Sequence, residues 1–395
     1  MDRPRLRILF LAPQPFFEVR GTPLAVLHLT RALAELGHEI DLLTFPQGEP
    51  VATPGVRHLR SLRLPVGRVK AGASLAKIVL DVPFAAEAVL RLAFSRYDVV
   101  HAVEESAHLV APFARLLGVP LVMDVDSSIP DQLRYSGFAT RGPLLWLAGA
   151  LERHALRHSV AAVTVCQSLS DGVKRRAPGV PVFQIEDPPL VDARQPPAAE
   201  AVETLRRELG LGDAPVVLYS GNFEPYQGVE LLLEATALVP AATFLLMGGR
   251  APEIERLQAR ARELGTNGRV FFSGTRPPAE LAAFLALADV LCSPRVQGEN
   301  TPFKIYSYLA SGKPIVATRI ATHTQLLDDS LAFLVPPTAE GLADGIGQAL
   351  RDPNEAQPRA ARGLELIDRE YSATRYREKV ARAYAEVARR TREHR

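Results

Sequence analysis

Short apolar runs alternate with amphipathic segments along this chain, and that alternation restricts the fold more than any other feature. The first half contains the runs RILFLA, EIDLLTF, YDVVHAV, PLVMDV, VAAVTVC and VPVFQI. Between them lie helix-like stretches such as 22–36, which is followed by Gly37 as a helix stop. Runs that are apolar throughout indicate strands buried on both faces, so we expect a parallel sheet with helices on both sides.

A second series of apolar runs follows a segment rich in Pro, Ala and acidic residues, 187–203. It comprises APVVLYSG, ATFLLMGG, RVFFSG, DVLCSP, PIVAT and AFLVPP. A length of 395 residues also favours two domains. The sequence therefore predicts an α/β protein with two doubly wound, Rossmann-like domains, 1–187 and 188–370, and a C-terminal helix over 371–395.

Composition argues against several classes of protein. The formal net charge of +2 disfavours binding to nucleic acid through a broad basic face. No uninterrupted apolar run approaches the roughly 20 residues of a spanning helix, and the first run is too short for a signal-peptide core. Cys166 and Cys292 lie in apolar runs, so we expect buried thiols and a reducing, cytoplasmic location. Because no residues have metal-ligand spacing, we expect no metal or cofactor.

The stretch 297–318, QGENTPFKIYSYLASGKPIVAT, combines a helix start with nearby charged residues. Thr301 is a good N-cap and Pro302 suits the first helical position, so a helix is predicted over 302–311. Gly312 can take the left-handed conformation that ends it. The start of a helix attracts anions, and Glu299 and Lys304 flank this one.

Ligands of open parallel sheets bind beyond the carboxyl ends of the strands, and these positions carry a pattern here. In the second half they hold glycines, small polar residues and helix starts: Gly221, Asn222, Gln227, Gly228, Gly248, Gly249, Ser293, Arg295 and Thr301. Such residues suit a diphosphate and a nucleoside, which predicts a nucleotide site. In the first half the corresponding positions hold Arg20, Gly21, Glu104, Glu105, Asp126 and Ser127.

These features resemble the family 4 glycosyltransferases, which are retaining enzymes of the GT-B fold. The resemblance rests on the order of elements, the glycine loop 221–228 and the stretches 269–294 and 299–318, and it covers nearly the whole chain. It implies two domains facing a cleft, with a nucleotide sugar bound mainly by the C-terminal domain and the acceptor mainly by the N-terminal one. It also implies that the helix 371–395 packs back on the N-terminal domain.

The family signature is a Glu, seven residues and a second Glu, and this chain matches half of it. Glu299 stands at the first position, which holds hydroxyls of the donor sugar, and Ser307 stands at the second, which contacts the ribose. The family also places an Arg and a Lys on the diphosphate where this chain has Asn222 and Gln227. The chain therefore lacks two cations that the resemblance leads us to expect.

Two basic residues are candidates to replace those cations. Lys304 and Ser307 are three residues apart and so share one helix face, and Arg295 precedes the loop. We expect the donor site to consist of Gly21, Gly221, Asn222, Gln227, Gly228, Gly249, Arg295, Asn300, Thr301, Pro302, Lys304 and Ser307. For His323 we expect a surface or helix-entry position rather than a catalytic role.

The resemblance implies transfer of a sugar from a nucleoside diphosphate to a hydroxyl group with retained anomeric configuration. We predict Glu299 and Asp126 as catalytic residues, and Arg20, Glu104 and Glu105 on the acceptor side. In this family the leaving phosphate is thought to take the acceptor's proton, so no separate base is required. A metal-independent enzyme is expected.

Several alternatives remain open at this stage. The acceptor could be a glycan, a lipid or a small molecule. The segment 56–70 mixes Arg and Lys with Leu and Val, so it suits either an anionic membrane surface or a solvated loop. A nucleotide-sugar epimerase shares the fold, and a non-catalytic protein that binds sugar nucleotides or glycans fits the missing cations.

Overall fold

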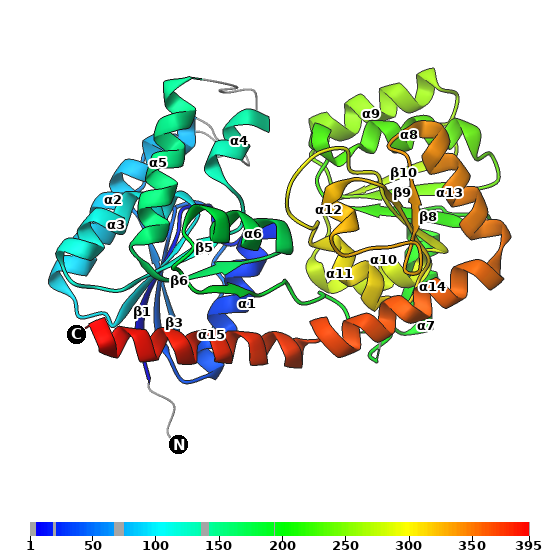
Figure 1. Cartoon of the computed structure of the whole chain (residues 1–395). Helices are drawn as coiled ribbons and strands as arrows, with labels where there is room; N and C mark the ends of the chain where they lie inside the picture. The colour runs from blue at the N-terminus through cyan, green and yellow to red at the C-terminus, as the bar shows by residue number, and fades with distance from the viewer. Residues whose placement is uncertain (1–4, 19–20, 67–74, 136–141, 193, 395) are drawn as a thin grey trace. The chain divides into compact units, whose positions relative to one another are not determined.

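The computed structural model describes residues 5–18, 21–66, 75–135, 142–192 and 194–394. The chain divides into two compact units (Figure 1). Unit 1 comprises Met1–Asp187 together with Tyr376–Arg395, and unit 2 comprises Pro188–Arg375. Each unit has its own parallel sheet and its own hydrophobic core, as the two series of apolar runs predict.

The sheet of unit 1 has seven parallel strands in the order β3-β2-β1-β4-β5-β6-β7. Their bounds are β1 Arg7–Ala12, β2 Glu39–Thr44, β3 Val56–Arg60, β4 Val99–Val103, β5 Leu121–Val125, β6 Ser159–Thr164 and β7 Val182–Gln184. The order reverses between β1 and β4, which is the switch point where sheets of this kind bind ligands.

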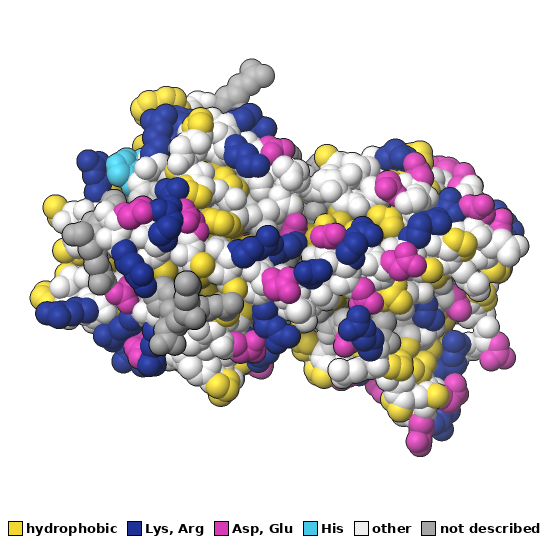
Figure 2. Space-filling view, turned by 60° about the horizontal axis from the view of Figure 1, so that its bottom comes forward, with side chains coloured by type: hydrophobic (Ala, Val, Ile, Leu, Met, Phe, Trp, Pro, Cys, Tyr) yellow, Lys and Arg dark blue, Asp and Glu magenta, His cyan; other side chains and the backbone are white. Residues whose placement is uncertain are grey.

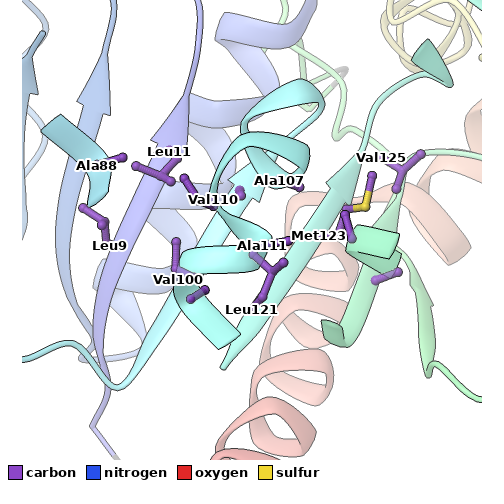
Figure 3. Close-up of a cluster of buried hydrophobic side chains, with 14 of the residues drawn as sticks. Leu9, Leu11, Ala88, Val100, Ala107, Val110, Ala111, Leu121, Met123 and Val125 are labelled. Atoms are coloured by element: carbon purple, nitrogen blue, oxygen red, sulfur yellow. The ribbon is translucent and has the colours of Figure 1, made fainter. Parts of the chain in front are cut away.

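Helices cover both faces of this sheet. The helices are α1 Gly21–Glu35, α2 Leu75–Phe94, α3 Glu105–Leu116, α4 Ile129–Tyr135, α5 Pro143–Arg157, α6 Gln167–Arg176 and α15 Ala373–His394. One core lies between the sheet and a layer that includes α2, α3, α5 and α6, and the other lies between the sheet and α1 with α15. Figure 3 shows how side chains of β1, β4 and β5 meet those of α2 and α3 in the first core.

The sheet of unit 2 has six parallel strands in the order β10-β9-β8-β11-β12-β13. Their bounds are β8 Val216–Ser220, β9 Thr243–Met247, β10 Val270–Gly274, β11 Val290–Ser293, β12 Ile315–Thr318 and β13 Phe333–Val335. The switch point of this sheet lies between β8 and β11.

The remaining elements of unit 2 are helical. The α-helices are α7 Ala199–Glu208, α8 Val229–Leu238, α9 Ala251–Glu263, α10 Leu281–Leu287, α11 Lys304–Ala310, α12 Ala321–Thr324, α13 Ala339–Arg351 and α14 Pro353–Leu366. Short turns of 3₁₀-helix, η1 Pro225–Gln227 and η2 Pro278–Glu280, and a π-helical turn, η3 Ile367–Tyr371, complete the unit. Because both faces of the sheet are covered, Cys292 on β11 is a buried free thiol, and Cys166 is likewise buried in unit 1.

The C-terminal helix α15 packs on the sheet of unit 1. Its residues Tyr376, Val380 and Tyr384 are buried in the same core as β1. The hydroxyl of Tyr384 is hydrogen-bonded to Nδ1 of His101 on β4 at 2.7 Å. The predicted helix 371–395 begins two residues later in the structure. Tyr371 ends the π-helical turn, and α15 begins at Ala373.

Residues 56–66, the described part of the segment 56–70, belong partly to the fold of unit 1. The first five residues of the segment form β3 at the edge of the sheet, where Arg57 pairs with Asp41 of β2. Leu64 and Val66 pack against the core of unit 1. Leu62, in contrast, is 65% exposed. The part 67–70 lies outside the described residues. The fold thus uses part of the described segment, and binding of the segment to a membrane stays a prediction.

Candidate functional site

Glycine turns bring the carboxyl ends of β8 and β9 into contact in unit 2. Gly221 follows β8 and Gly248 follows β9, and both have positive φ angles, 145° and 121°. A Cβ atom on Gly248 would lie 1.9 Å from the carbonyl oxygen of Gly221, so only glycine fits there. On Gly249 it would lie 2.2 Å from the ring of Phe223. The two turns therefore approach each other at backbone level.

Gly228 brings the loop after β8 against the end of β11 in the same way. Its φ angle is 70°, and a Cβ atom would lie 2.0 Å from the carbonyl oxygen of Pro294. This close contact spans the switch point between β8 and β11. The predicted residues Gly221, Gly228 and Gly249 thus belong to one cluster of tight turns.

Lys304, the first residue of α11, reaches into this cluster. Its Nζ lies 3.1 Å from Oε1 of Gln227 and 3.8 Å from the ring centroid of Tyr219. The same nitrogen lies 2.8 Å from the position that a Cβ atom on Gly221 would take. The structure therefore brings three predicted residues together, Gly221, Gln227 and Lys304. Sequence reasoning missed Tyr219, because a tyrosine within an apolar strand is typical of a core residue.

The electrostatic environment of Lys304 is unusual for a lysine. Burial, and then the charge of Arg295, lower the pKa of Lys304 well below its usual value. In the described part of the chain, no carboxylate forms an ion pair with Lys304. An amine that lacks a counter-charge next to a glycine turn is a favourable place for an anion.

The side chain of Arg295 forms hydrogen bonds with residues of its own loop. The side chain is buried, its Nε donates to the carbonyl oxygen of Gln297 at 2.7 Å, and its Nη2 donates to Oδ1 of Asn300 at 3.1 Å. A Cβ atom on Gly298 would collide with the guanidinium group, so the loop wraps closely around it. Arg295 and Asn300 thus fix the shape of the loop that carries Glu299.

Glu299 lies in an irregular segment that is fixed at both ends. Its carbonyl oxygen accepts a hydrogen bond from Nε2 of Gln325 at 2.9 Å. The predicted helix start at Pro302 is wrong, because α11 begins at Lys304 and no side chain caps it. Thr301 and Pro302 are buried, and Pro302 instead closes a turn by accepting from the amide of Ile305.

The side chains of Ser307 and Asn222 form hydrogen bonds within unit 2. The Ser307 side chain is only 1% exposed, and its Oγ accepts a hydrogen bond from the amide of Leu190 at 3.0 Å. This hydroxyl is therefore buried, whereas the predicted contact with a ribose requires an accessible one. Oδ1 of Asn222 accepts from the amide of Glu224 at 3.2 Å and so shapes the loop after β8.

His323 is a structural residue of the core and not a surface residue. Its Nδ1 lies 2.7 Å from the carbonyl oxygen of Thr318, and its Nε2 lies 2.9 Å from Oγ of Ser293. Burial lowers the pKa of His323 to about 4. The expectation of a non-catalytic role fits these contacts. Of the two expected positions, the surface is wrong, whereas the entry of a helix is right, because His323 lies in the short helix α12.

A group of carboxylates lies at the end of β4 in unit 1. Glu104 has a φ angle of 50°, which is rare for a residue with a side chain, and its Oε1 accepts from Oγ of Ser127 at 2.5 Å. Glu105 forms an ion pair with Lys77 of α2 at 2.5 Å. Although burial opposes it, the charges of Glu105 and Glu104 raise the pKa of Lys77. Sequence reasoning missed Lys77, because only the fold brings α2 to β4.

Asp126 is buried among other acids at the end of β5. Burial, and then Asp124, Glu104 and Asp187, raise the pKa of Asp126 well above its usual value. Burial likewise raises the pKa of Asp187 to about 8. Carboxyl groups that stay protonated near neutral pH can donate hydrogen bonds, and perturbed groups of this kind are common at functional sites.

The remaining predicted residues of unit 1 lie at the start of α1. Gly21 is the first residue of this helix, and nothing lies within 4 Å of the position a Cβ atom would take. Arg20 lies outside the described residues. Open space at Gly21 is consistent with a ligand passing close to the backbone there.

The described part of the chain lacks two features. Among those residues, no helix is long and apolar enough to cross a membrane. No group of three or more His, Cys, Asp and Glu side chains there could hold a metal ion. On the face that Figure 2 draws, Lys and Arg side chains are mixed with Asp and Glu rather than gathered into one basic region.

Two family descriptions match the chain, one in each unit. Residues 20–185 match the Glycosyl transferase 4-like domain, and residues 201–363 match Glycosyl transferases group 1. Together these matches cover most of both units.

Curated relatives are similar over part of their length. The GDP-mannose-dependent alpha-(1-6)-phosphatidylinositol monomannoside mannosyltransferase of Mycolicibacterium smegmatis is 32% identical over 182 residues, 43% of this chain and 47% of that protein. The alpha-D-kanosaminyltransferase of Streptomyces kanamyceticus is 27% identical over 292 residues, 69% of this chain and 72% of that protein. The chain thus spans about half the length of the first relative and nearly three quarters of the second.

Solved structures show the same fold over nearly the whole chain. Sucrose-phosphate synthase from Thermosynechococcus elongatus superposes with a TM-score of 0.79 at 22% identity and covers 97% of this chain and 99% of that one. HepE from Anabaena, solved in complex with UDP and glucose, gives a TM-score of 0.76 at 18% identity and covers 96% of this chain and 100% of that one. With both sequence matches and this GT-B fold, the chain belongs to the family 4 glycosyltransferases.

Proposed function

We propose that this chain transfers a sugar from a nucleoside diphosphate sugar to a hydroxyl group of a glycan, lipid or small-molecule acceptor, with retention of the anomeric configuration. The observation that carries the proposal is the amine of Lys304 beside Gly221 and Gln227. A bound diphosphate raises the pKa of this amine and so favours its charged form, and the glycine turns let the diphosphate approach the backbone. The names of two relatives support a nucleotide-sugar donor, since one depends on GDP-mannose and another was solved with UDP-glucose.

The proposed role of Lys304 is to stabilise the leaving diphosphate. Negative charge grows on this group as the bond to the sugar breaks, and a fixed cation in a partly buried site stabilises that charge. A charge-assisted hydrogen bond contributes roughly 1.5–3 kcal/mol, about twice a neutral one. Lys304 would thus replace the cations that Asn222 and Gln227 do not supply.

The proposed role of Glu299 is to orient the donor sugar. Its loop is fixed by Arg295 on one side and by Gln325 on the other, so the backbone at Glu299 has a defined position. A carboxylate that accepts from sugar hydroxyls would hold the anomeric carbon in place for reaction. The proposed retention of the anomeric configuration rests on the family resemblance. In that family the leaving phosphate is thought to take the acceptor's proton.

The proposed acceptor side is unit 1, at the ends of β4 and β5. Asp126, which carries a raised pKa, and Glu104, held by Ser127, supply groups that can bind hydroxyls. Glu105 is already engaged by Lys77, so we assign it a supporting role.

The test is a thermal-shift panel of nucleoside diphosphates and nucleotide sugars on the full-length wild type, Glu299→Ala and the control Glu255→Ala. A ligand present at about 100 times its Kd stabilises the native state by roughly 2.7 kcal/mol, which is a shift of several degrees. We expect one nucleotide sugar to stabilise the wild type and Glu255→Ala equally. Glu299→Ala should keep the shift with the nucleoside diphosphate and lose the extra shift from the sugar.

Assays with the donor found in this way separate the alternatives. Transfer to an added acceptor supports the transferase, and conversion of the donor to an epimer without acceptor supports an epimerase. Binding without turnover on any acceptor supports a non-catalytic sugar-nucleotide protein. If nothing in the panel shifts the melting temperature, the donor site proposed here does not exist.

A further inference from the structure

Helix α2 turns an apolar surface towards solvent along its whole described length. Over 76–94, every residue that is exposed is apolar: Ile78, Val79, Val82, Ala86, Leu90, Ala93 and Phe94. They recur about every four residues and so form one stripe. Val82 and Phe94 are 69% and 83% exposed. A surface helix normally places polar residues on its outer face, so this stripe needs another explanation.

The stripe extends over the neighbouring helices α3 and α5. Twelve of the fourteen large hydrophobic side chains that are exposed in the described chain lie on α2, on α5 or on α3 and the residue after it, whereas Leu238 is the one such residue in unit 2. Leu116 and Trp146 are 82% and 70% exposed. The helices α2, α3 and α5 contact one another in sequence and lie on the same side of the sheet (Figure 1). Together their outer surfaces form what we call the apolar face.

Arginines border the apolar face where the three helices end. Each helix leads back from the carboxyl edge of the sheet to its amino edge, because it joins two parallel strands. Arg96, Arg115 and Arg157, at or just beyond these helix ends, are exposed, and no carboxylate pairs with them among the described residues. Of the two acids of α2, Glu87 pairs with Arg91 of the same helix, and Asp81 is half-buried.

We propose that the apolar face of α2, α3 and α5 docks on an anionic lipid surface. Exposed Leu, Val, Phe and Trp side chains next to arginines that no carboxylate neutralises have the composition of an interfacial membrane-binding surface. A second copy of the chain is a poorer partner, because a symmetric contact would place the arginines against a face that offers them no free carboxylate. This proposal does not depend on the donor chemistry in unit 2.

The test is co-sedimentation of the full-length chain with vesicles of phosphatidylcholine alone or with about 30% phosphatidylglycerol, at about 0.05 M and about 0.5 M salt. We expect the wild type to sediment with the anionic vesicles and high salt to weaken this binding. The triple variant Val82→Glu, Leu90→Glu, Leu116→Glu should bind at least tenfold less. Leu238→Glu, which places the same change on an exposed leucine of unit 2, should bind as the wild type does.

A second variant, Arg96→Gln with Arg115→Gln and Arg157→Gln, keeps the test valid should the triple glutamate variant fail to fold. It should lose most of the binding to anionic vesicles. Absence of sedimentation of the wild type, or equal sedimentation of the wild type and both variants, would overturn the proposal. So would a wild type that is dimeric by light scattering together with a triple glutamate variant that is monomeric, since a second copy would then cover this face.

Discussion

The Nζ atom of Lys304 lies 3.1 Å from Oε1 of Gln227, a residue 77 positions earlier in the chain. The family resemblance places a lysine at the position of Gln227, and here the glutamine instead accepts a hydrogen bond from a lysine on another element. An amine that a bound anion can protonate is thus present at the glycine turns, although it comes from α11. This arrangement supports the proposal that the site binds a diphosphate without the usual side chains.

Removing the charge of Lys304 should not destabilise the ligand-free protein. Burial and Arg295 lower the pKa of Lys304, so the folded state disfavours its charged form. Lys304→Met should therefore melt at the same temperature as the wild type or slightly above it, by up to roughly 1 kcal/mol in the free energy of unfolding. Differential scanning calorimetry checks this, and a melting temperature several degrees lower would show that the amine is needed by the fold.

Binding of a diphosphate should take up a proton. The pKa of Lys304 is lowered well below 10.5 in the free protein, and an adjacent anion raises it again, so the bound state holds the proton more tightly. Affinity should therefore fall as the pH rises. Calorimetric titrations at pH 8 in two buffers with different ionisation enthalpies measure the protons taken up. Equal observed enthalpies in both buffers would contradict the prediction.

Alanine at Gly248 should destabilise unit 2 by about 1–3 kcal/mol. Its Cβ would lie 1.9 Å from the carbonyl oxygen of Gly221, and its φ angle is 121°. Gly268→Ala is the matched control, because nothing lies within 4 Å of its Cβ position. Thermal melting of the two variants should show a loss only for Gly248→Ala. Equal melting temperatures would mean that the two turns are not in close contact.

Acid should destabilise the fold through its buried histidines. Burial lowers the pKa of His323, and likewise those of His28 and His108, to about 4, against 6.5 when unfolded. Between these values the unfolded state binds more protons, so stability is present above pH 6.5 and is lost as the pH falls towards 4, by roughly 1–3 kcal/mol per histidine. Melting temperatures between pH 7.5 and 4.5 should fall less for His323→Gln than for the wild type. Parallel curves would exclude a contribution from His323.

Asparagine at Asp126 should separate acceptor chemistry from donor binding. The pKa of Asp126 is raised in the folded state, so its contribution to stability is lost as the pH rises above the unfolded value of 3.8. Asp126→Asn should therefore be at least as stable as the wild type at pH 8. Its affinity for the nucleoside diphosphate should be unchanged while sugar transfer falls at least tenfold. Unchanged transfer would remove Asp126 from the reaction.

The sequence predicts the architecture well because apolar runs report directly on buried strands. Both parallel sheets, the buried cysteines and the left-handed glycines at 37 and 312 agree with it. Local rules failed where tertiary packing decides the outcome. Thr301 and Pro302 form a good helix start in isolation, but both are buried, and α11 begins two residues later.

Contacts between distant segments account for the other differences in the candidate site. The bond between Leu190 and Ser307 and the pair of Lys77 with Glu105 join residues that no local pattern relates. Residues 56–60 show the same limit, since their basic and apolar residues form an edge strand that packs on a core. The apolar face could not be predicted either, because the sequence of α2 does not say which of its sides is exposed.

The most direct test of the account compares a nucleoside diphosphate with the corresponding monophosphate by isothermal titration calorimetry, in the wild type, Lys304→Met and the control Lys313→Met. Nζ of Lys313 donates to the carbonyl oxygen of Ala286 at 3.0 Å, away from the glycine turns. We predict that the diphosphate binds the wild type and Lys313→Met about 10 to 100 times more tightly than the monophosphate, and that Lys304→Met loses this difference. A difference that persists in Lys304→Met would show that the diphosphate binds elsewhere.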